Sequence, residues 1–311
     1  MINFRFHLIS LIAVFLALAV GVVMGYGVLG QPTVDTLQSR VNAVERRANE
    51  IRADNGRLRA EQARLESVLA DAGEFVATNR LAGASVLPVA VRGVDEDKVT
   101  ETIQLARRSA GASVPGVVWL EDSWGLAEAD DAARLAAIVG TTSTTRAGVR
   151  EAAARALANR LTVGPTTGRD LLTDLEDAGF ISFQDVDGVA FDPTKLDGRT
   201  SRVLVVGGNA TATPFAHNAL PLVTALADAG RLVAVADDWR ETDQGPARGQ
   251  ELGVIRDDGD LRGQVSTLDN LDTADGPLLA VLVLGDLGRG TIGHYGFGDG
   301  AERAVPEWWV E

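Results

Sequence analysis

The most restrictive feature of this 311-residue chain is an uncharged apolar run near its N-terminus. From Leu8 to Leu29 the sequence LISLIAVFLALAVGVVMGYGVL contains no charged residue over 22 positions. A helix rises about 1.5 Å per residue, so a helix of this length crosses the roughly 30 Å hydrocarbon layer of a bilayer. The run therefore predicts a transmembrane anchor within residues 1–30.

A secretory signal peptide is the alternative, because Ala17-Leu18-Ala19 offers an A-x-A cleavage site. Cleavage there would leave the apolar segment 20–29 on the mature protein, and the run exceeds the roughly 7–15 apolar residues typical of a signal. The length favours an uncleaved anchor. Arg5 precedes the run, so the positive-inside rule predicts a single-pass membrane protein with a cytoplasmic N-terminus and an extracytoplasmic body.

Small residues recur at every fourth position of the anchor. Such residues let two helix backbones approach closely in lipid, and GxxxG is the best known case. They are also common in membrane helices that do not associate. The spacing indicates a membrane-helix packing face made of Ala13, Ala17, Gly21 and Gly25.

A heptad repeat follows the anchor. Beyond Gln31-Pro32 the apolar residues alternate at spacings of three and four, and with Val34 at position a every d position is aliphatic over five heptads. Asn55 lies at an a position, where a buried amide favours two parallel strands in fixed register. The repeat predicts a coiled coil over residues 31–73 that pairs the chain with itself as a parallel dimer, through a seam of Leu37, Val44, Ile51, Asn55, Leu58 and Leu65.

Two alternatives to this homodimer remain open. Of four charged pairs that would flank the seam, two attract and two repel, so the charges leave room for a different partner chain. The segment is also compatible with one amphipathic helix packed on its own globular domain.

Residues 74–311 alternate between short β-branched runs and alanine-rich helical stretches. The predicted strands are 85–91, 117–120, 202–206, 232–236 and 278–284, and the predicted helices are 95–110, 128–139, 146–161, 169–178 and 215–229. This alternation predicts an α/β fold, namely a mostly parallel α/β sandwich of one or two lobes. A boundary between two lobes would fall near residues 162–167.

Composition excludes several function classes. The chain has 43 acidic and 29 basic residues and a net charge of -14, which disfavours nucleic acid as a partner. It has no cysteine, hence no disulfide, thiolate nucleophile or zinc ribbon. No G-x-S-x-G or H-E-x-x-H occurs, and neither His217 nor His294 is near a nucleophile elbow, so we expect no catalytic residue and no enzyme activity.

Two glycine clusters resemble phosphate-binding loops without completing one. Gly288, Gly290 and Gly293 form GxGxxG after a predicted strand, but no helix or acidic strand follows them, so we expect a glycine-rich terminal loop and no cofactor. The turn 207–209 follows another predicted strand and would accept an anion. However, it lacks the Walker lysine, and tight turns after strands favour glycine anyway.

Four stretches together resemble the actinobacterial copper-transport family called MctB. They are FRFHLISLIAVFLALAVGVVMG at 4–25, STLDNLD at 266–272, VLVLGDL at 281–287 and GHYGFGDGA at 293–301. The resemblance implies an anchor, a coiled coil and an α/β body in that order. It also implies a role in keeping cytoplasmic copper low, with a channel proposed for the mycobacterial outer membrane. Family members are further linked to a cytoplasmic or envelope protein partner and to cell separation.

The ligand chemistry of the chain fits copper poorly. Copper sites use thiolate, thioether or imidazole ligands, whereas this chain has no Cys, two Met including Met1, and three His, namely His7, His217 and His294. We therefore expect no metal site, and one apolar helix cannot enclose a pore alone. The resemblance predicts a membrane-anchored envelope protein implicated in copper homeostasis or efflux. The alternative is a non-enzymatic coiled-coil scaffold or regulator of cell-envelope division.

Overall fold

The computed structural model describes residues 4–27, 31–165, 168–196, 201–242 and 245–306. The chain divides into two compact units, an N-terminal unit, Met1–Leu65, and a C-terminal unit, Glu66–Glu311. Each unit has an architecture of its own.

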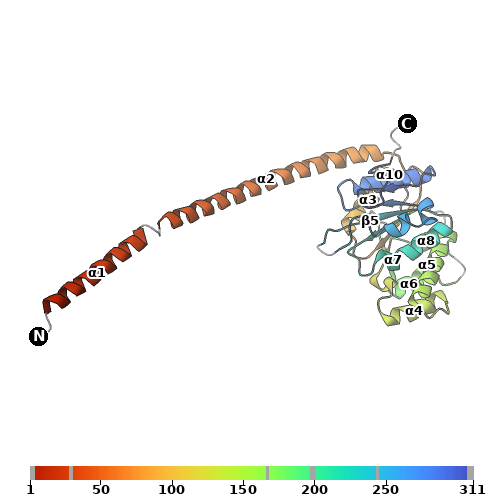
Figure 1. Cartoon of the computed structure of the whole chain (residues 1–311). Coiled ribbons are helices and arrows are strands. Elements are labelled where there is room, and N and C mark those ends of the chain that lie inside the picture. Colours follow the sequence, from red (N-terminus) through yellow and green to blue (C-terminus); the bar gives the residue numbers. More distant parts are fainter. Residues whose placement is uncertain (1–3, 28–30, 166–167, 197–200, 243–244, 307–311) are drawn as a thin grey trace. The chain divides into compact units, whose positions relative to one another are not determined.

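Two helices account for the described part of the N-terminal unit (Figure 1). Helix α1, Phe4–Gly27, carries apolar side chains on every face, and its span Phe4–Gly25 is long and apolar enough to cross a membrane. Helix α2, Gln31–Ala77, begins with Pro32 in its first turn, where the missing N–H of proline leaves no hydrogen bond unmade. It continues beyond Leu65 into the C-terminal unit.

The C-terminal unit is built on one seven-stranded sheet with the order β3-β2-β1-β4-β5-β6-β7. All neighbouring pairs are parallel except β2 with β3, which is antiparallel. The strands are β1 (Val86–Val91), β2 (Val117–Leu120), β3 (Ile181–Gln184), β4 (Arg202–Gly208), β5 (Leu232–Asp238), β6 (Val265–Leu268) and β7 (His294–Tyr295). The predicted mostly parallel α/β fold is confirmed.

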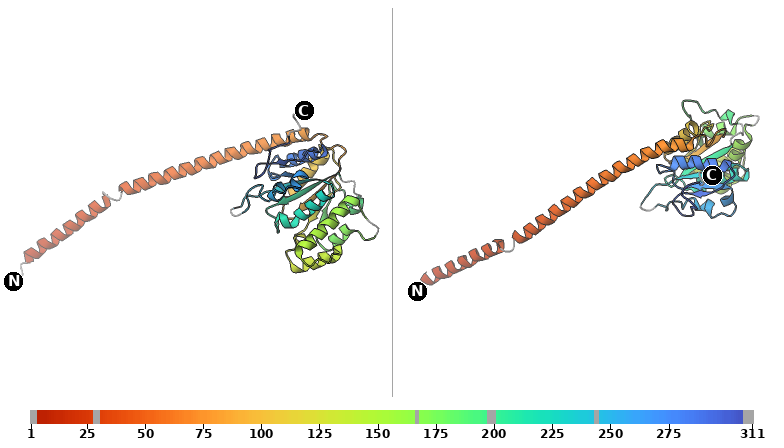
Figure 2. Two further views of the ribbon diagram at one scale, coloured as in Figure 1. Left: turned by 45° about the vertical axis from the view of Figure 1, so that its right-hand side comes forward. Right: turned by 90° about the horizontal axis from the view of Figure 1, so that it is seen from above.

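Helices cover both faces of this sheet (Figure 1, Figure 2). Alternate residues of β4 point to opposite faces, with Val203 and Val205 in one core and Leu204 and Val206 in the other. The first core is covered by α4 (Ala129–Val139), α5 (Arg146–Val163), α6 (Leu171–Asp177), α7 (Phe215–Asn218) and α8 (Leu220–Asp228). The second core is covered by α3 (Glu96–Arg108), α10 (Gly276–Gly288) and the last turns of α2.

Some predicted elements are wrong. The predicted strand 278–284 lies inside α10, whose residues are buried on nearly every side, so the sequence there shows no periodicity that distinguishes helix from strand. The predicted helix 215–229 is two helices that meet at Ala219, with Pro221 in the first turn of the second. Strands β3, β6 and β7, which are only two to four residues long, are not among the predicted strands.

Candidate functional site at the carboxyl edge of the sheet

The strand order reverses between β1 and β4, and open α/β sheets commonly bind ligands beyond the carboxyl ends of the strands at such a point. Here the loops that follow these strands touch. A Cβ atom on Gly93, whose φ is 101°, would lie 3.0 Å from the carbonyl oxygen of Ala210. The N–H of Asp95 donates to Asp238 Oδ2 at 2.7 Å. Backbone and carboxylate therefore occupy the space where a ligand would enter.

The glycine turn after β4 is also used for packing. A Cβ atom on Gly207 would lie 2.7 Å from the Phe215 ring, and one on Gly208 would lie 2.5 Å from the carbonyl oxygen of Asp238. The Asn209 amide accepts from the N–H of Arg240 at 2.8 Å and donates to its carbonyl oxygen at 2.7 Å. Close packing thus explains the two glycines and the asparagine of the turn 207–209, where the sequence suggested an anion site.

Buried acidic side chains gather at the carboxyl ends of β5 and β6. Asp237, Asp238 and Asp269 are 3%, 1% and 0% exposed. Burial raises the pKa of Asp237 to about 8, with further contributions from the negative charges of Glu251 and Asp269. Among the described residues, none donates a hydrogen bond to its carboxyl group in the structure. Asp237 is therefore mostly a neutral acid at pH 7.

Asp269 lies in a different arrangement, a fully buried ion pair with Arg256 at 2.9 Å. Its carboxylate also accepts the N–H groups of Phe297 at 2.8 Å and Gly298 at 3.1 Å. The Arg256 guanidinium donates further to Thr267 Oγ1 at 2.9 Å and to the carbonyl oxygen of Tyr295 at 3.0 Å. Each charge of the pair is thus surrounded by hydrogen bonds, which a buried ion pair needs to be stable.

The glycines of the terminal loop leave room for this ion pair. Gly296 has a φ of 126°, and a Cβ atom there would overlap the carboxylate of Asp269. A Cβ atom on Gly298 would overlap the carbonyl group of Arg248. The expected glycine-rich loop is present. The GxGxxG begins at the end of helix α10, so the prediction that it follows a strand is wrong.

His294 lies inside the same network and is 2% exposed. Its Nδ1 is 2.9 Å from Thr267 Oγ1 and its Nε2 is 3.2 Å from the carbonyl oxygen of Arg262. Burial lowers the pKa of His294, so the ring is neutral at pH 7. The Thr267 hydroxyl accepts from Arg256, so it donates to Nδ1, and Nε2–H donates to the carbonyl oxygen. Both ring nitrogens are occupied by structural hydrogen bonds.

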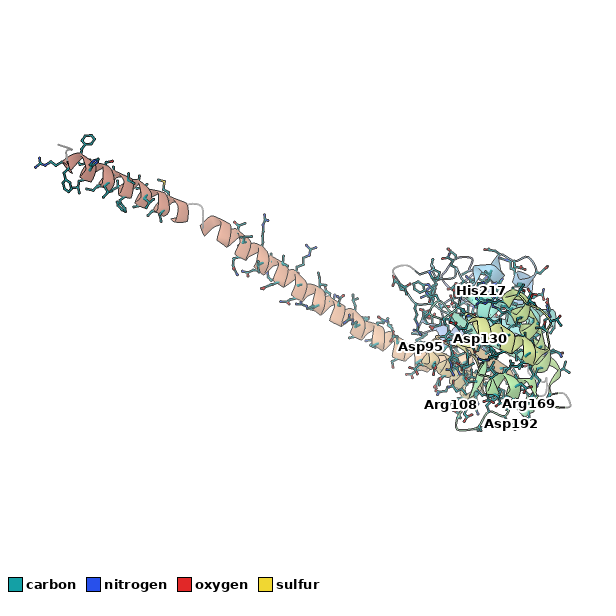
Figure 3. All side chains as sticks on the ribbon, turned by 90° about the horizontal axis from the view of Figure 1, so that it is seen from below. Asp95, Arg108, Asp130, Arg169, Asp192 and His217 are labelled. Atoms are coloured by element: carbon teal, nitrogen blue, oxygen red, sulfur yellow. The ribbon has the colours of Figure 1, made fainter. Side chains whose placement is uncertain are left out.

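The three histidines lie on three different elements. His7 lies on α1, His217 is exposed on α7 (Figure 3), and His294 is buried beside β6. Among the residues that the structure describes, no group of three or more His, Cys, Asp or Glu side chains is arranged to hold a metal ion.

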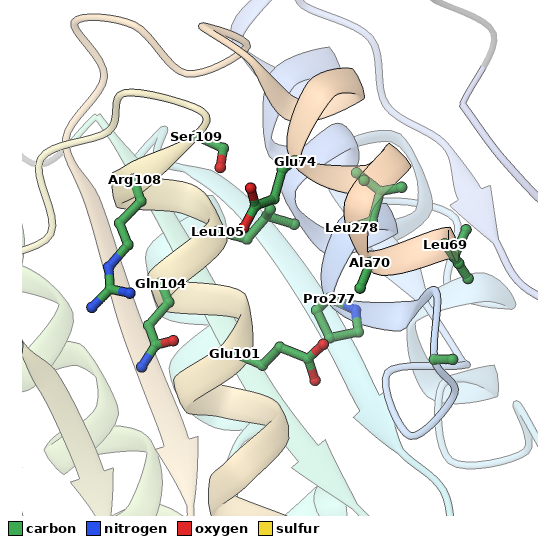
Figure 4. Close-up of a pocket in the computed structure, with 12 residues that line it drawn as sticks. Leu69, Ala70, Glu74, Glu101, Gln104, Leu105, Arg108, Ser109, Pro277 and Leu278 are labelled. Carbon is green, nitrogen blue, oxygen red and sulfur yellow. The ribbon is translucent and has the colours of Figure 1, made fainter. Parts of the chain in front are cut away.

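A small pocket lies on the other side of the sheet from α5, between the last turns of α2 and helices α3 and α10 (Figure 4). Its volume is about 140 Å³, below the roughly 300–1,000 Å³ of pockets that enclose small-molecule ligands. Leu69, Leu105 and Leu278 form its apolar wall, and Glu74 and Arg108 lie at its polar side.

The predicted surfaces of α1 and α2 are exposed in the single chain. Ala13, Ala17, Gly21 and Gly25 lie on α1 at the predicted spacing, and the seam residues lie on α2. The large seam side chains are all more than half exposed, namely Leu37 (57%), Val44 (68%), Ile51 (53%), Leu58 (62%) and Leu65 (59%). Asn55 is exposed as well. Helix association in the membrane and the coiled coil remain predictions.

The buried network at the carboxyl edge was missed by sequence reasoning. Two of the stretches that resemble the family contain residues of this network, because STLDNLD holds Asp269 and GHYGFGDGA holds His294 and Gly296. Arg256 gave no signal, because nothing in its neighbourhood of the sequence distinguishes it from an exposed arginine. The hydrogen bonds that Asp269 accepts from Arg256 and from Phe297 join residues that are 13 and 28 positions apart, and no local sequence pattern reports such contacts.

The chain matches known proteins over nearly its whole length. The family described as "Copper transport outer membrane protein, MctB" matches residues 1–306. A protein of Mycobacterium leprae (strain TN) named "Copper transporter MctB" is 31% identical over 332 residues, which cover 99% of this chain and 100% of that protein. The protein of the same name from Mycobacterium tuberculosis (strain ATCC 25618 / H37Rv) is 26% identical over 322 residues, 97% of this chain and 98% of that one. The chain therefore belongs to the MctB family of copper transport outer membrane proteins.

Proposed function

We propose that this protein is a single-pass protein of the cell envelope that contributes to copper homeostasis. Residues 1–30 act as the anchor, 31–73 as a coiled coil and 74–311 as an extracytoplasmic α/β domain. The observation that carries the proposal is the family match, because it spans α1, α2 and the sheet together. Relatives that cover nearly the whole chain are named copper transporters.

The chain contributes to copper homeostasis without passing the ion along its own side chains. Copper transfer uses thiolate, thioether or imidazole ligands placed in succession, and this sequence offers no Cys, two Met and three His. Two of the buried acidic side chains at the carboxyl ends of β5 and β6 already have partners in the protein. Asp269 pairs with Arg256, and Asp238 accepts a hydrogen bond from the N–H of Asp95. The proposed role is to present the α/β domain outside the membrane to other envelope components.

A deletion strain tests the copper role. We expect loss of the gene to lower copper tolerance, and the full chain to restore it. A chain without residues 1–30 should fail to restore it, although its α/β domain still folds. Unchanged copper tolerance in the deletion strain would contradict the proposal.

Titration separates an indirect role from direct binding. We expect the full chain in detergent to bind Cu(I) and Cu(II) no more tightly than about 1 µM, corresponding to about -8 kcal/mol. His217→Ala removes the one exposed histidine of the described part of the C-terminal unit and is the matched control. Tight binding that this substitution abolishes would assign His217 a direct role in holding copper.

A second candidate function is that of a scaffold or regulator of cell-envelope division. Two observations favour it, namely the exposed apolar seam of α2 and the filled carboxyl edge of the sheet. A deletion strain that keeps its copper tolerance but fails to separate daughter cells would select this function. Lowered copper tolerance with normal cell separation would exclude it.

A further inference from the structure

The last turns of α2 carry two distinct apolar faces within the C-terminal unit. On one face Gly73 and Ala77 are buried, and Leu69 and Val76 are half-buried. This face packs on α10, because a Cβ atom on Gly73 would lie 3.5 Å from Leu278 (Figure 4). The protein's own α/β domain thus occupies this side of the helix.

The second face is exposed and apolar. Val68 is 58% exposed, Phe75 is 83% exposed, and Ala72 between them is exposed as well. Spacings of four and three residues place these three side chains on one stripe of the helix, which we name the distal stripe. A single exposed apolar residue needs no explanation, but a stripe at helical spacing that includes a phenylalanine does.

Both faces contain residues of the heptad register predicted for the seam. In the register of the predicted seam, Leu69 and Val76 are a positions, yet both lie on the face that packs on α10. At about 100° of rotation per residue, the three side chains of the distal stripe lie roughly 100° to 160° around the helix from Gly73. A second helix therefore cannot reach the a positions here, whereas the d position Ala72 and the g positions Val68 and Phe75 stay free.

We infer that a second copy of this chain covers the distal stripe, and that the contact between the two copies shifts at Leu65 from the a and d positions to the d and g positions. This inference rests on the proposed pairing through α2. The shift requires two successive steps of three residues, from Gln62 to Leu65 and from Leu65 to Val68. Such an interruption is known in coiled coils and overwinds them locally.

The occupant follows from continuity and symmetry. The distal stripe continues a line of exposed d residues, Ile51, Leu58 and Leu65, on the same uninterrupted helix. A two-fold dimer places identical surfaces against each other, and this stripe is self-complementary because it carries no charge. Asp71 lies three residues after Val68 and four before Phe75, so it borders the stripe, whereas Glu74 lies off it. Each helix would thus bury one face in its own domain and the other in its partner.

Cysteine crosslinking tests the register, because the chain has no native cysteine and each introduced thiol is unique. The full-length chain in membranes carries Val68→Cys or Phe75→Cys, and the neighbouring Leu69→Cys and Val76→Cys serve as matched controls. Leu58→Cys reports pairing in the upstream seam. Diamide is the oxidant, so that no copper is added. A disulfide needs Cβ atoms about 3.5–4.5 Å apart, so crosslinking distinguishes adjacent positions.

We expect Leu58→Cys, Val68→Cys and Phe75→Cys to shift from monomer to dimer on a non-reducing gel, and Leu69→Cys and Val76→Cys to remain monomeric. Crosslinking of Leu58→Cys with Leu69→Cys and Val76→Cys, but not with the distal stripe, would overturn the shift and leave the proposed pairing intact. Absence of crosslinking at all five positions would overturn both the pairing and the shift.

Discussion

The two units of the chain differ in where their apolar side chains lie. In the C-terminal unit, residues such as Leu157 and Phe180 are fully buried in cores on both faces of the sheet. In the N-terminal unit, Phe15 is 63% exposed and Leu58 is 62% exposed. Burying a side chain of this size stabilises a protein by about 1.5–3 kcal/mol. The C-terminal unit obtains this stabilisation from its own chain, whereas we expect the N-terminal unit to obtain it from lipid and from a second chain.

The ion pairs differ in the same way. Arg256 and Asp269 in the C-terminal unit are both fully buried, whereas Arg57 and Asp54 on α2 are 76% and 63% exposed. A buried charge depends on its partner because water cannot replace it. An exposed charge loses little when its partner is removed, because water screens it. The same kind of substitution should therefore have unequal effects in the two units.

The largest effect is expected from Asp269→Asn. The substitution leaves the Arg256 guanidinium buried without its counter-charge, which should lower the free energy of unfolding by about 3–5 kcal/mol. Tryptophan fluorescence during denaturant unfolding measures this, because all five tryptophans follow residue 118 and so report only the C-terminal unit. The matched substitution Asp54→Asn, followed by circular dichroism because α2 contains no tryptophan, should change stability by less than about 1 kcal/mol. Equal effects of the two substitutions would remove the contrast between the units.

Glycine-to-alanine substitutions should have opposite signs in the two units. Gly296→Ala forces a side chain onto a residue with a φ of 126° and into the carboxylate of Asp269, so we expect a loss of at least about 1–3 kcal/mol. Gly56→Ala lies in the middle of α2 with no atom within 4 Å of the new methyl group. It should stabilise α2 by about 0.5–1 kcal/mol. Thermal unfolding followed by fluorescence and by circular dichroism compares them, and destabilisation by Gly56→Ala would be evidence against an open helix surface there.

The pH dependence should reveal the neutral acid at the end of β5. The pKa of Asp237 is about 8 in the folded chain against 3.8 for the unperturbed group. Between these values the folded state keeps a proton that the unfolded state releases, so stability falls as pH rises, by up to about 1.4 kcal/mol per pH unit. Asp237→Asn removes this loss.

The variant should therefore gain stability relative to the natural chain between pH 6 and pH 8, measured by denaturant unfolding at each pH. The exposed substitution Asp257→Asn should follow the curve of the natural chain. Parallel curves for Asp237→Asn and the natural chain would show that Asp237 is ionised in the folded state.

Sequence patterns predict the fold class and much of the sheet. Strands β1, β2, β4 and β5 are expected at nearly their observed positions, because each is a β-branched run between helical stretches. Helix α10 resembles a strand in the sequence, since a segment buried on all sides carries no periodicity. Strand β6 escapes prediction because Ser266 and Thr267 interrupt its apolar pattern, and both are fully buried.

The buried network is beyond local patterns for a different reason. The glycine-rich loop is expected as a structural feature, but its purpose depends on Asp269 and Arg256, which reach it only in the folded chain. The apolar seam of α2, in contrast, follows from heptad spacing alone. The sequence is most informative where a surface is periodic and least informative where charges meet across the fold.

The mass of the full chain in detergent tests the central contrast most directly. Light scattering that separates protein mass from detergent mass should give two chains per particle for the natural protein. The double substitution Ile51→Glu and Leu58→Glu should give one chain, with unchanged tryptophan fluorescence because the C-terminal unit folds without a partner. A natural protein that is already a single chain would contradict the claim that the exposed seam of α2 is covered by a second copy.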